Sequence, residues 1–124
     1  MPTYTERHTV AVTTDGSGDS TDYTPVVTGR VIAIIYTKTD FATGVDFTIT
    51  AEGSTEGLWT EVNVDASKTV APRQPTHSQV GVASLYAAAG EPVEDHIYLA
   101  NDRVKIVVAN GGTTKTGSFD VVIG

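Results

Sequence analysis

The sequence of 124 residues contains no cysteine, which excludes disulfide bonds, thiolate metal sites and cysteine nucleophiles. Basic residues are scarce: 8 Lys and Arg stand against 15 Asp and Glu, so the formal net charge is −7. This balance argues against a nucleic-acid-binding protein and a polybasic membrane-surface module, because both depend on Lys and Arg. No apolar run approaches the roughly 18 residues of a membrane span. Residues 1–7 lack the apolar core of a signal peptide, so none is expected.

Strong helix formers are also few, whereas β-branched residues are abundant. The chain has 3 Leu and 1 Met against 20 Thr, 17 Val and 7 Ile, and β-branched side chains pack well on a pleated sheet. Twelve Gly and five Pro interrupt the chain about every ten residues, a spacing typical of β-sandwiches and barrels. The sequence therefore predicts an all-β, single-domain antiparallel β-sandwich of about eight strands over residues 1–124, jelly-roll-like or immunoglobulin-like. A closed barrel is the alternative.

Three segments give the clearest strand patterns. Residues 45–51 alternate between apolar and polar side chains, so the apolar set is expected to face a core. Residues 31–36 form the most apolar run, which predicts a central strand covered on both faces. In the next strand, period-two alternation places Leu58 and Val62 on one face and Trp59 on the other.

The remaining strand predictions are shorter, and one segment stays ambiguous. Residues 82–89 are mostly apolar and are followed by Gly90 and Pro92, which fits a short helix or turn, a strand or an extended loop. Further strands are expected at residues 3–14, 68–71, 97–99, 104–108 and 118–123.

No catalytic motif is visible. His8, His77 and His96 lie far apart in the sequence and show no two-histidine metal spacing. The run Glu94, Asp95 and His96 fits a solvated loop better than an acid-base site. Neither a serine nucleophile elbow nor a phosphate-binding loop is present. We therefore expect a protein that is not an enzyme and takes no cofactor.

The acidic loop at residues 15–22 raises the question of a calcium site. Asp15, Asp19 and Asp22 would supply carboxylate oxygens, which calcium prefers. Their spacing differs from that of an EF-hand, and acidic Gly/Ser loops are ordinary turn chemistry. We therefore expect no metal site and keep these three residues as weak candidates.

Two other features bear on partner binding. Trp59 is the only tryptophan, and the pattern allows a core residue, an exposed interface anchor or a stacking platform for a sugar ring. Residues 72–75, with the sequence Pro-Arg-Gln-Pro, are stiff and polar, and Pro72 is expected to end the preceding strand. This segment fits either a crossover loop or a preformed arm that contacts another subunit.

Three stretches carry a resemblance to a known group of proteins: residues 6–19, residues 29–36 running on to 45–52, and residues 111–119. Through them the chain resembles small structural proteins encoded in the virion-assembly regions of tailed bacteriophages, and is most similar to head decoration, or cement, proteins. The resemblance implies a small β-rich protein that binds the outside of an assembled capsid as a symmetric dimer or trimer. Its partner would be the major capsid protein, with no nucleic acid or membrane involved, and assembly would take place in the bacterial cytoplasm.

Extended segments are expected to make the capsid contacts. An N-terminal arm over residues 2–8 and the segment 72–77 are both able to add a strand to a neighbour or lie along a groove. Deletion of residues 2–8 is expected to weaken capsid binding and leave the fold intact. The interface candidates are Tyr4, Glu6, Arg7, His8, Trp59, Pro72, Arg73, Gln74 and Pro75.

The sequence leaves two other function classes open. A tail or head–tail-joining virion protein is the first, and it would form stacked rings or polymerise. A carbohydrate-binding β-sandwich module is the second, and it requires Trp59 to be exposed.

Overall fold

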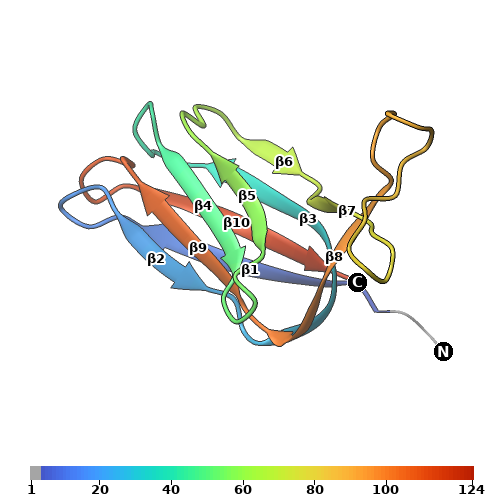
Figure 1. Cartoon of the computed structure of the whole chain (residues 1–124). Coiled ribbons are helices and arrows are strands. Elements are labelled where there is room, and N and C mark those ends of the chain that lie inside the picture. Colours follow the sequence, from blue (N-terminus) through green and yellow to red (C-terminus); the bar gives the residue numbers. More distant parts are fainter. Residues whose placement is uncertain (1–3) are drawn as a thin grey trace.

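The computed structural model describes residues 4–124, which form ten strands and no helix (Figure 1). The six-stranded sheet contains β1 (Glu6–Thr13), β10 (Thr116–Ile123), β3 (Val27–Lys38), β8 (Glu94–Asp102) and β7 (Arg73–Pro75) in that order, with β6 (Lys68–Val70) also paired to β3. The four-stranded sheet contains β2 (Ser20–Tyr23), β9 (Val104–Ala109), β4 (Asp46–Ala51) and β5 (Gly57–Glu61) in that order. Every pairing is antiparallel, which confirms the predicted β-sandwich. The described strands form two separate sheets, so the closed-barrel alternative is wrong.

The core lies between the two sheets and is built from alternate residues of the strands. In β4 and the residue before it, the predicted inward set is buried, and β10 shows the same period of two. A strand directs successive side chains to opposite faces, so one apolar face per strand is enough to fill this layer. The buried residues of these two segments are Val45, Phe47, Ile49, Ala51, Phe119, Val121 and Ile123.

Strand β3 is central in its sheet, but only one of its faces is fully buried. Val31, Ile34 and Tyr36 point into the core, whereas Ile32 and Ile35 are half-buried on the outer face. The prediction that this run is covered on both faces is therefore wrong. An irregular register opposite β10, between Val122 and Ile123, sets the two inward residues 31 and 34 three positions apart.

Strand β5 also departs from simple alternation. Ile49 pairs with Trp59 and Thr50 pairs with Gly57, so Leu58 is the extra residue of a β-bulge. A bulge re-aims the neighbouring side chains, and Leu58 and Trp59 are both buried as a result. The predicted placement of Leu58 and Val62 on one face and Trp59 on the other fails, because Leu58 and Trp59 are both buried and Val62 lies beyond the strand and is exposed.

Five aromatic rings form the centre of the core and join the two sheets. The ring of Phe47 lies 4.7 Å from Tyr36, 4.8 Å from Phe119 and 5.3 Å from Trp59, measured between centroids, in edge-to-face geometry. Phe41, from the loop between β3 and β4, stacks on Tyr36 at 6.0 Å. Aromatic pairs at such separations are more favourable than their buried area alone implies.

The hydroxyl of Tyr36 is the one polar side-chain atom in the described residues that is buried without a hydrogen-bond partner. Burial raises the pKa of Tyr36 to about 12. An unsatisfied buried hydroxyl costs free energy, because the atom loses its bonds to water on folding.

We therefore expect Tyr36→Phe to raise the free energy of unfolding by about 1 kcal/mol, measured by urea denaturation. The unfolded chain releases the Tyr36 proton at a lower pH than the folded protein does, so this tyrosine lowers the free energy of unfolding as the pH rises above 10. The Phe variant should therefore lose less stability than the wild type above pH 10. A loss of stability at pH 7 would contradict the prediction.

Three loops interlock at the end of the sandwich opposite the C-terminus (Figure 1). The amide of Ala42 donates to the carbonyl of Gly111 at 2.9 Å, and the amide of Gly111 donates to Gly18 at 2.9 Å. The Thr14 hydroxyl donates to the carbonyl of Gly112 at 2.6 Å. A Cβ on Gly111 would lie 2.8 Å from the methyl group of Thr14, so this close approach requires glycine.

Candidate interaction surfaces

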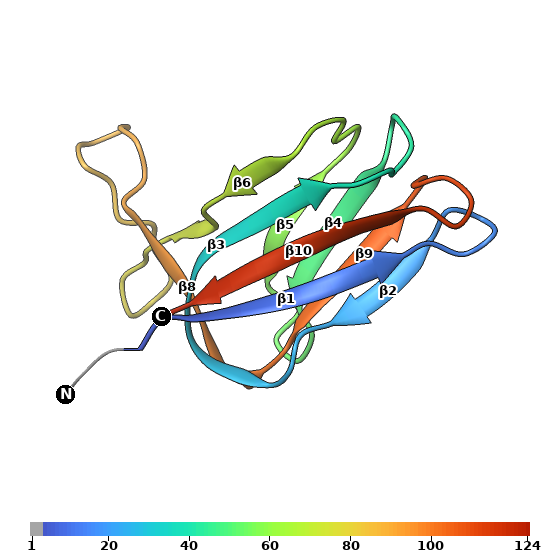
Figure 2. The same cartoon turned by 180° about the vertical axis from the view of Figure 1, so that it is seen from behind.

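The chain leaves the sandwich between β7 and β8 to form a projecting segment, residues 76–93, which we call the forked excursion. It lies at the same end of the molecule as the C-terminus (Figures 1 and 2). Its base is closed by three hydrogen bonds: Thr76 N to Val93 O at 2.7 Å, Ser84 N to Thr76 O at 3.0 Å and Val93 N to Ser84 O at 2.9 Å. These bonds bring the middle of the segment back to its base and divide it into two branches.

Each branch ends in a tight turn. In the first, the Ser78 amide donates to Val82 O at 2.8 Å, and Gly81 has a φ of +80°. In the second, the Tyr86 amide donates to Glu91 O at 3.0 Å, and Ala89 has a φ of +58°. Backbone bonds therefore hold both branches in shape without a core of their own. Of the alternatives for residues 82–89, the structure shows an extended loop at 82–85 that runs into a bend and turn at 86–89.

The forked excursion exposes apolar side chains and carries little charge. Val80 is 77% exposed and Tyr86 is 76% exposed, and Val82 and Leu85 are exposed as well. Glu91 is the one Asp, Glu, Lys or Arg between residues 76 and 93, whereas such residues make up 19% of the whole chain. Depletion of charge together with exposed Tyr, Leu and Val is the composition of the centre of a protein interface.

Sequence reasoning missed this surface. The signal that would have found it is a run of 18 residues with one charge, in a segment where apolar residues follow neither a strand period nor a helix period. Such residues have no sheet or helix face to join, so they are left on the surface.

The predicted contact segment 72–75 is part of the sheet instead of a free arm. Strand β7 pairs Arg73 with His96 and Gln74 with Asp95, on the edge of the six-stranded sheet. Proline is tolerated there because an edge strand leaves every second N–H unpaired. Pro72 is buried, while Arg73 and Pro75 are exposed. The segment thus forms the rigid base from which the forked excursion leaves the sandwich.

The predicted N-terminal arm is also part of the sheet in its last three residues. Glu6, Arg7 and His8 form the first part of β1 and pair with residues 121–123 of β10. The guanidinium of Arg7 donates to Asp120 at 2.8 Å, and His8 contacts Glu6 at 3.0 Å. A deletion of residues 2–8 would remove three paired residues of β1, so we now expect it to weaken the six-stranded sheet as well as any contact made by this segment. Residues 1–3 lie outside the described part of the chain.

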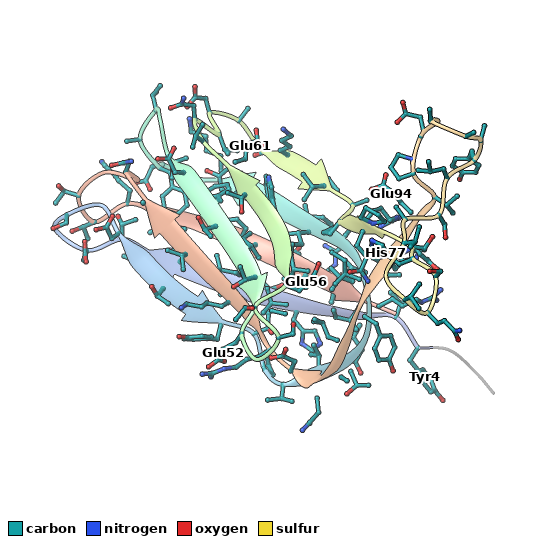
Figure 3. All side chains as sticks on the ribbon, in the orientation of Figure 1. Tyr4, Glu52, Glu56, Glu61, His77 and Glu94 are labelled. Atoms are coloured by element: carbon teal, nitrogen blue, oxygen red, sulfur yellow. The ribbon has the colours of Figure 1, made fainter. Side chains whose placement is uncertain are left out.

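Tyr4 precedes β1 and is largely exposed. Figure 3 shows it at the same end of the sandwich as His77 and Glu94, which belong to the forked excursion and to the start of β8. This end therefore gathers Tyr4 and the excursion, while the interlocked loops occupy the other end.

The acidic loop is organised by its own backbone. The carboxylate of Asp15 accepts hydrogen bonds from the amides of Ser17 at 2.8 Å and Asp19 at 3.1 Å. The amide of Asp19, followed by that of Ser17, holds the pKa of Asp15 below its usual value. Asp22 lies on β2 and accepts a hydrogen bond from Ser20. Within residues 4–124, no three His, Asp or Glu side chains come together in a group able to hold a metal ion.

Trp59 is a core residue, as one of the sequence alternatives predicted. It is 7% exposed, and its ring lies 5.3 Å from Phe47 and 6.5 Å from Phe119. Its indole N–H donates to Glu61 at 3.0 Å, and Glu61 also accepts from Lys68 at 2.8 Å, which links β5 to β6 across the open side of the sandwich. The ring therefore has no exposed face for a partner protein or for a sugar.

The run at residues 94–96 opens strand β8. The carboxylate of Asp95 lies 3.2 Å from the ring Nδ1 of His96 and accepts the amide of His96 at 2.7 Å. These bonds from His96 hold the pKa of Asp95 below its usual value. The geometry is that of a local strand-entry contact between neighbouring residues.

The surface of residues 4–124 has no pocket. Residues 4–124 contain no long, apolar helix of the kind that spans a membrane. No family model matches the sequence, and no curated protein matches it.

Proposed function

We propose that this chain is a virion structural protein of a tailed bacteriophage, a decoration or cement protein that binds the outer surface of the head. The resemblance of residues 6–19, 29–36 with 45–52, and 111–119 to such proteins supplies the partner, the major capsid protein. The forked excursion supplies the contact, and its exposed, nearly uncharged surface is the observation that carries the proposal.

The excursion is suited to binding because its shape is set before the partner arrives. Its base and both turns are held by backbone hydrogen bonds, so little conformational entropy is lost when Val80, Val82, Leu85 and Tyr86 are buried. The removal of these side chains from water would provide the driving force. The fold behind them is a rigid β-sandwich with an aromatic centre.

The net charge of the free protein and the number of copies that bind together both fit a decoration protein. A net charge of −7 keeps the free protein soluble despite the exposed apolar side chains. Because the protein binds the assembled lattice and not the separate capsid subunits, binding stabilises the lattice by mass action. A symmetric homo-oligomer would engage several capsid subunits at once and gain avidity from the linkage. The protein acts without catalysis or a cofactor, on virions assembled in the host cytoplasm.

The test compares two double variants of the same chemistry. Val80→Asp with Val82→Asp places charge on the first turn of the excursion, whereas Val26→Asp with Val62→Asp changes valines that are 58% and 63% exposed on loops outside it. Each protein is mixed with capsids assembled from the major capsid protein of the same virion-assembly region, and the bound copies are counted after sedimentation. We expect the excursion variant to bind at least about tenfold more weakly, because a buried, unpaired carboxylate is costly. The control variant should saturate the capsid like the wild type.

Each contrary result has a distinct meaning. Equal binding by both variants would remove the excursion from the interface while keeping the capsid as the partner. Failure of the wild type to bind capsids would overturn the decoration proposal. Stacked rings or filaments of the free protein would then indicate the tail-protein alternative.

A further inference from the structure

Strand β1 is the outermost strand of the six-stranded sheet, and its far side is unpaired. It runs for eight residues and is bonded on one side to β10, as Figure 2 shows along the front of the sandwich. Its register with β10 is unbroken from Glu6 to Thr13, so it contains no bulge, and it contains no proline. An unprotected edge of this length is a template for pairing with another strand.

The hydrogen bonds define which backbone groups of β1 are open. The amide of Thr14, in register with β10, donates to the carbonyl of Lys115 at 2.9 Å. Because amides alternate in direction along a strand, the even-numbered residues of β1 face β10 and the odd-numbered residues face outward. The open N–H and C=O groups belong to Arg7, Thr9, Ala11 and Thr13, and no hydrogen bond within residues 4–124 uses them. The four side chains are all exposed.

The other sheet edges differ from β1 in length or protection. β7 and β6 have three residues each, and β7 ends in Pro75. β2 has four residues, and β5 has five with a bulge at Leu58. β7 covers only residues 94–96 of β8, and the remaining open side of β8 is irregular, because its register with β3 shifts between Leu99 and Asp102. Short strands, prolines and bulges are the features by which proteins prevent edge pairing. Among the described strands, β1 is therefore the one edge that is long, regular and unprotected.

We propose that a second copy of this chain pairs with β1 through its own β1, antiparallel, so that the six-stranded sheets of two subunits become one continuous sheet. A two-fold axis between Val10 and Val10 of the partner subunit sets the register. It pairs Arg7 with Thr13 of the partner subunit and Thr9 with Ala11 of the partner subunit, and the symmetry repeats both pairs. This register uses the open groups of all four odd-numbered residues and leaves none unpaired.

Charge favours a second copy in this antiparallel direction. Arg7 lies near the start of β1, whereas the end of β1 leads into the acidic loop with Asp15 and Asp19. Antiparallel pairing brings Arg7 diagonally opposite Asp15 of the partner subunit on the outer face, because Asp15 is two residues beyond Thr13. Parallel pairing would place like charges together at both ends. At the centre, Thr9 meets Ala11, so the directly paired side chains are small and uncharged.

The first experiment measures mass against concentration for matched proline variants. Ala11→Pro removes an open N–H of β1. Thr60→Pro is the control and removes an N–H on the open edge of β5. The N–H of Thr60 faces away from β4, because the neighbouring residues 59 and 61 are the ones that bond to β4. Wild type and Thr60→Pro should have about twice the monomer mass of 13.0 kDa at about 100 μM in sedimentation equilibrium. Ala11→Pro should have the monomer mass. A monomeric wild type, or an Ala11→Pro variant that remains dimeric, would overturn the proposal.

A second experiment keeps the test decisive if the proline variant does not fold. The two-fold axis makes Val10 and its symmetry mate a non-hydrogen-bonded pair, with Cβ atoms about 5 Å apart and within reach of a disulfide after a small shift. The chain has no cysteine, so Val10→Cys can form a disulfide only between subunits. We expect Val10→Cys to give a covalent dimer on mild oxidation, while the exposed control Val62→Cys stays largely monomeric. Equal cross-linking of both variants, or none for Val10→Cys, would contradict the pairing. Neither experiment involves the capsid, so the result is independent of the decoration proposal.

Discussion

Replacement of Phe47 by alanine should lower the free energy of unfolding by about 4 kcal/mol, within the range for large aromatic residues in well-packed cores. Phe47 is fully buried on β4, and its ring lies against aromatic residues of both sheets and of the loop between β3 and β4: Tyr36, Trp59, Phe119 and Phe41. Loss of the ring removes its transfer free energy and leaves a cavity between rings that are held by four different elements. Surrounding strands cannot collapse onto such a cavity without breaking their register, so most of the cost should remain.

The measurement is urea denaturation followed by circular dichroism, since the fluorescence of Trp59 would change with the loss of its neighbour at 5.3 Å. Val62→Ala is the matched control, because it truncates an exposed residue and should change stability by less than about 0.5 kcal/mol. A cost below about 2 kcal/mol for Phe47→Ala would mean that the aromatic cluster is not the main support of the sandwich.

The strands that obey a strict period of two were predictable from the sequence. Residues 45–51 place their apolar side chains inward as expected, and the strand expected at 118–123 follows the same period, because each strand has one core face and one outer face. The predictions failed where a bulge changes the period. The extra residue at Leu58 turns Trp59 inward, and the irregularity opposite β10 separates Val31 from Ile34 by three positions. A bulge depends on the pairing with a distant strand, which a local pattern does not contain.

The candidate surfaces were harder to predict than the core. Residues 6–8 and 73–75 are polar and look like free arms in the sequence, yet each forms an edge strand through pairing with a partner far along the chain. The forked excursion depends on bonds between Thr76, Ser84 and Val93, which have no sequence signature. What the sequence does show there is the near absence of charge, and this property turned out to mark the surface.

The two proposed surfaces are compatible with each other. Tyr4, two residues before β1, lies at the end of the sandwich that carries the forked excursion (Figure 3). Antiparallel pairing through β1 therefore directs the two excursions of a dimer toward opposite ends of the shared sheet. A dimer of this kind would contact two separate places on a capsid, which is the arrangement that a protein needs to clamp neighbouring subunits. The avidity of the pair would then depend on the β1 contact as much as on the excursions.

Gly117→Ala should destabilise the protein by about 2 kcal/mol, although it adds one methyl group. Gly117 lies in β10, and a Cβ at this position would come within 2.6 Å of the ring of Phe41. Phe41 is itself buried and stacked on Tyr36, so its ring has no free space into which it can withdraw. Gly57→Ala, in β5, is the matched control: no atom lies within 4 Å of the added methyl group. The control should be neutral or stabilise the protein by about 0.5 kcal/mol, because alanine reduces the entropy of the unfolded chain.

A double-mutant cycle separates the clash from any effect on the strand itself. If the methyl group destabilises the protein by pressing on the ring, Gly117→Ala should cost much less in a Phe41→Ala background, where the ring is absent. If the cost comes from the backbone of β10, it should be the same in both backgrounds. The cycle is read from urea midpoints of the four proteins at constant slope. Equal costs would show that the ring of Phe41 yields to the methyl group, and that glycine is needed at position 117 for the strand instead of for the core.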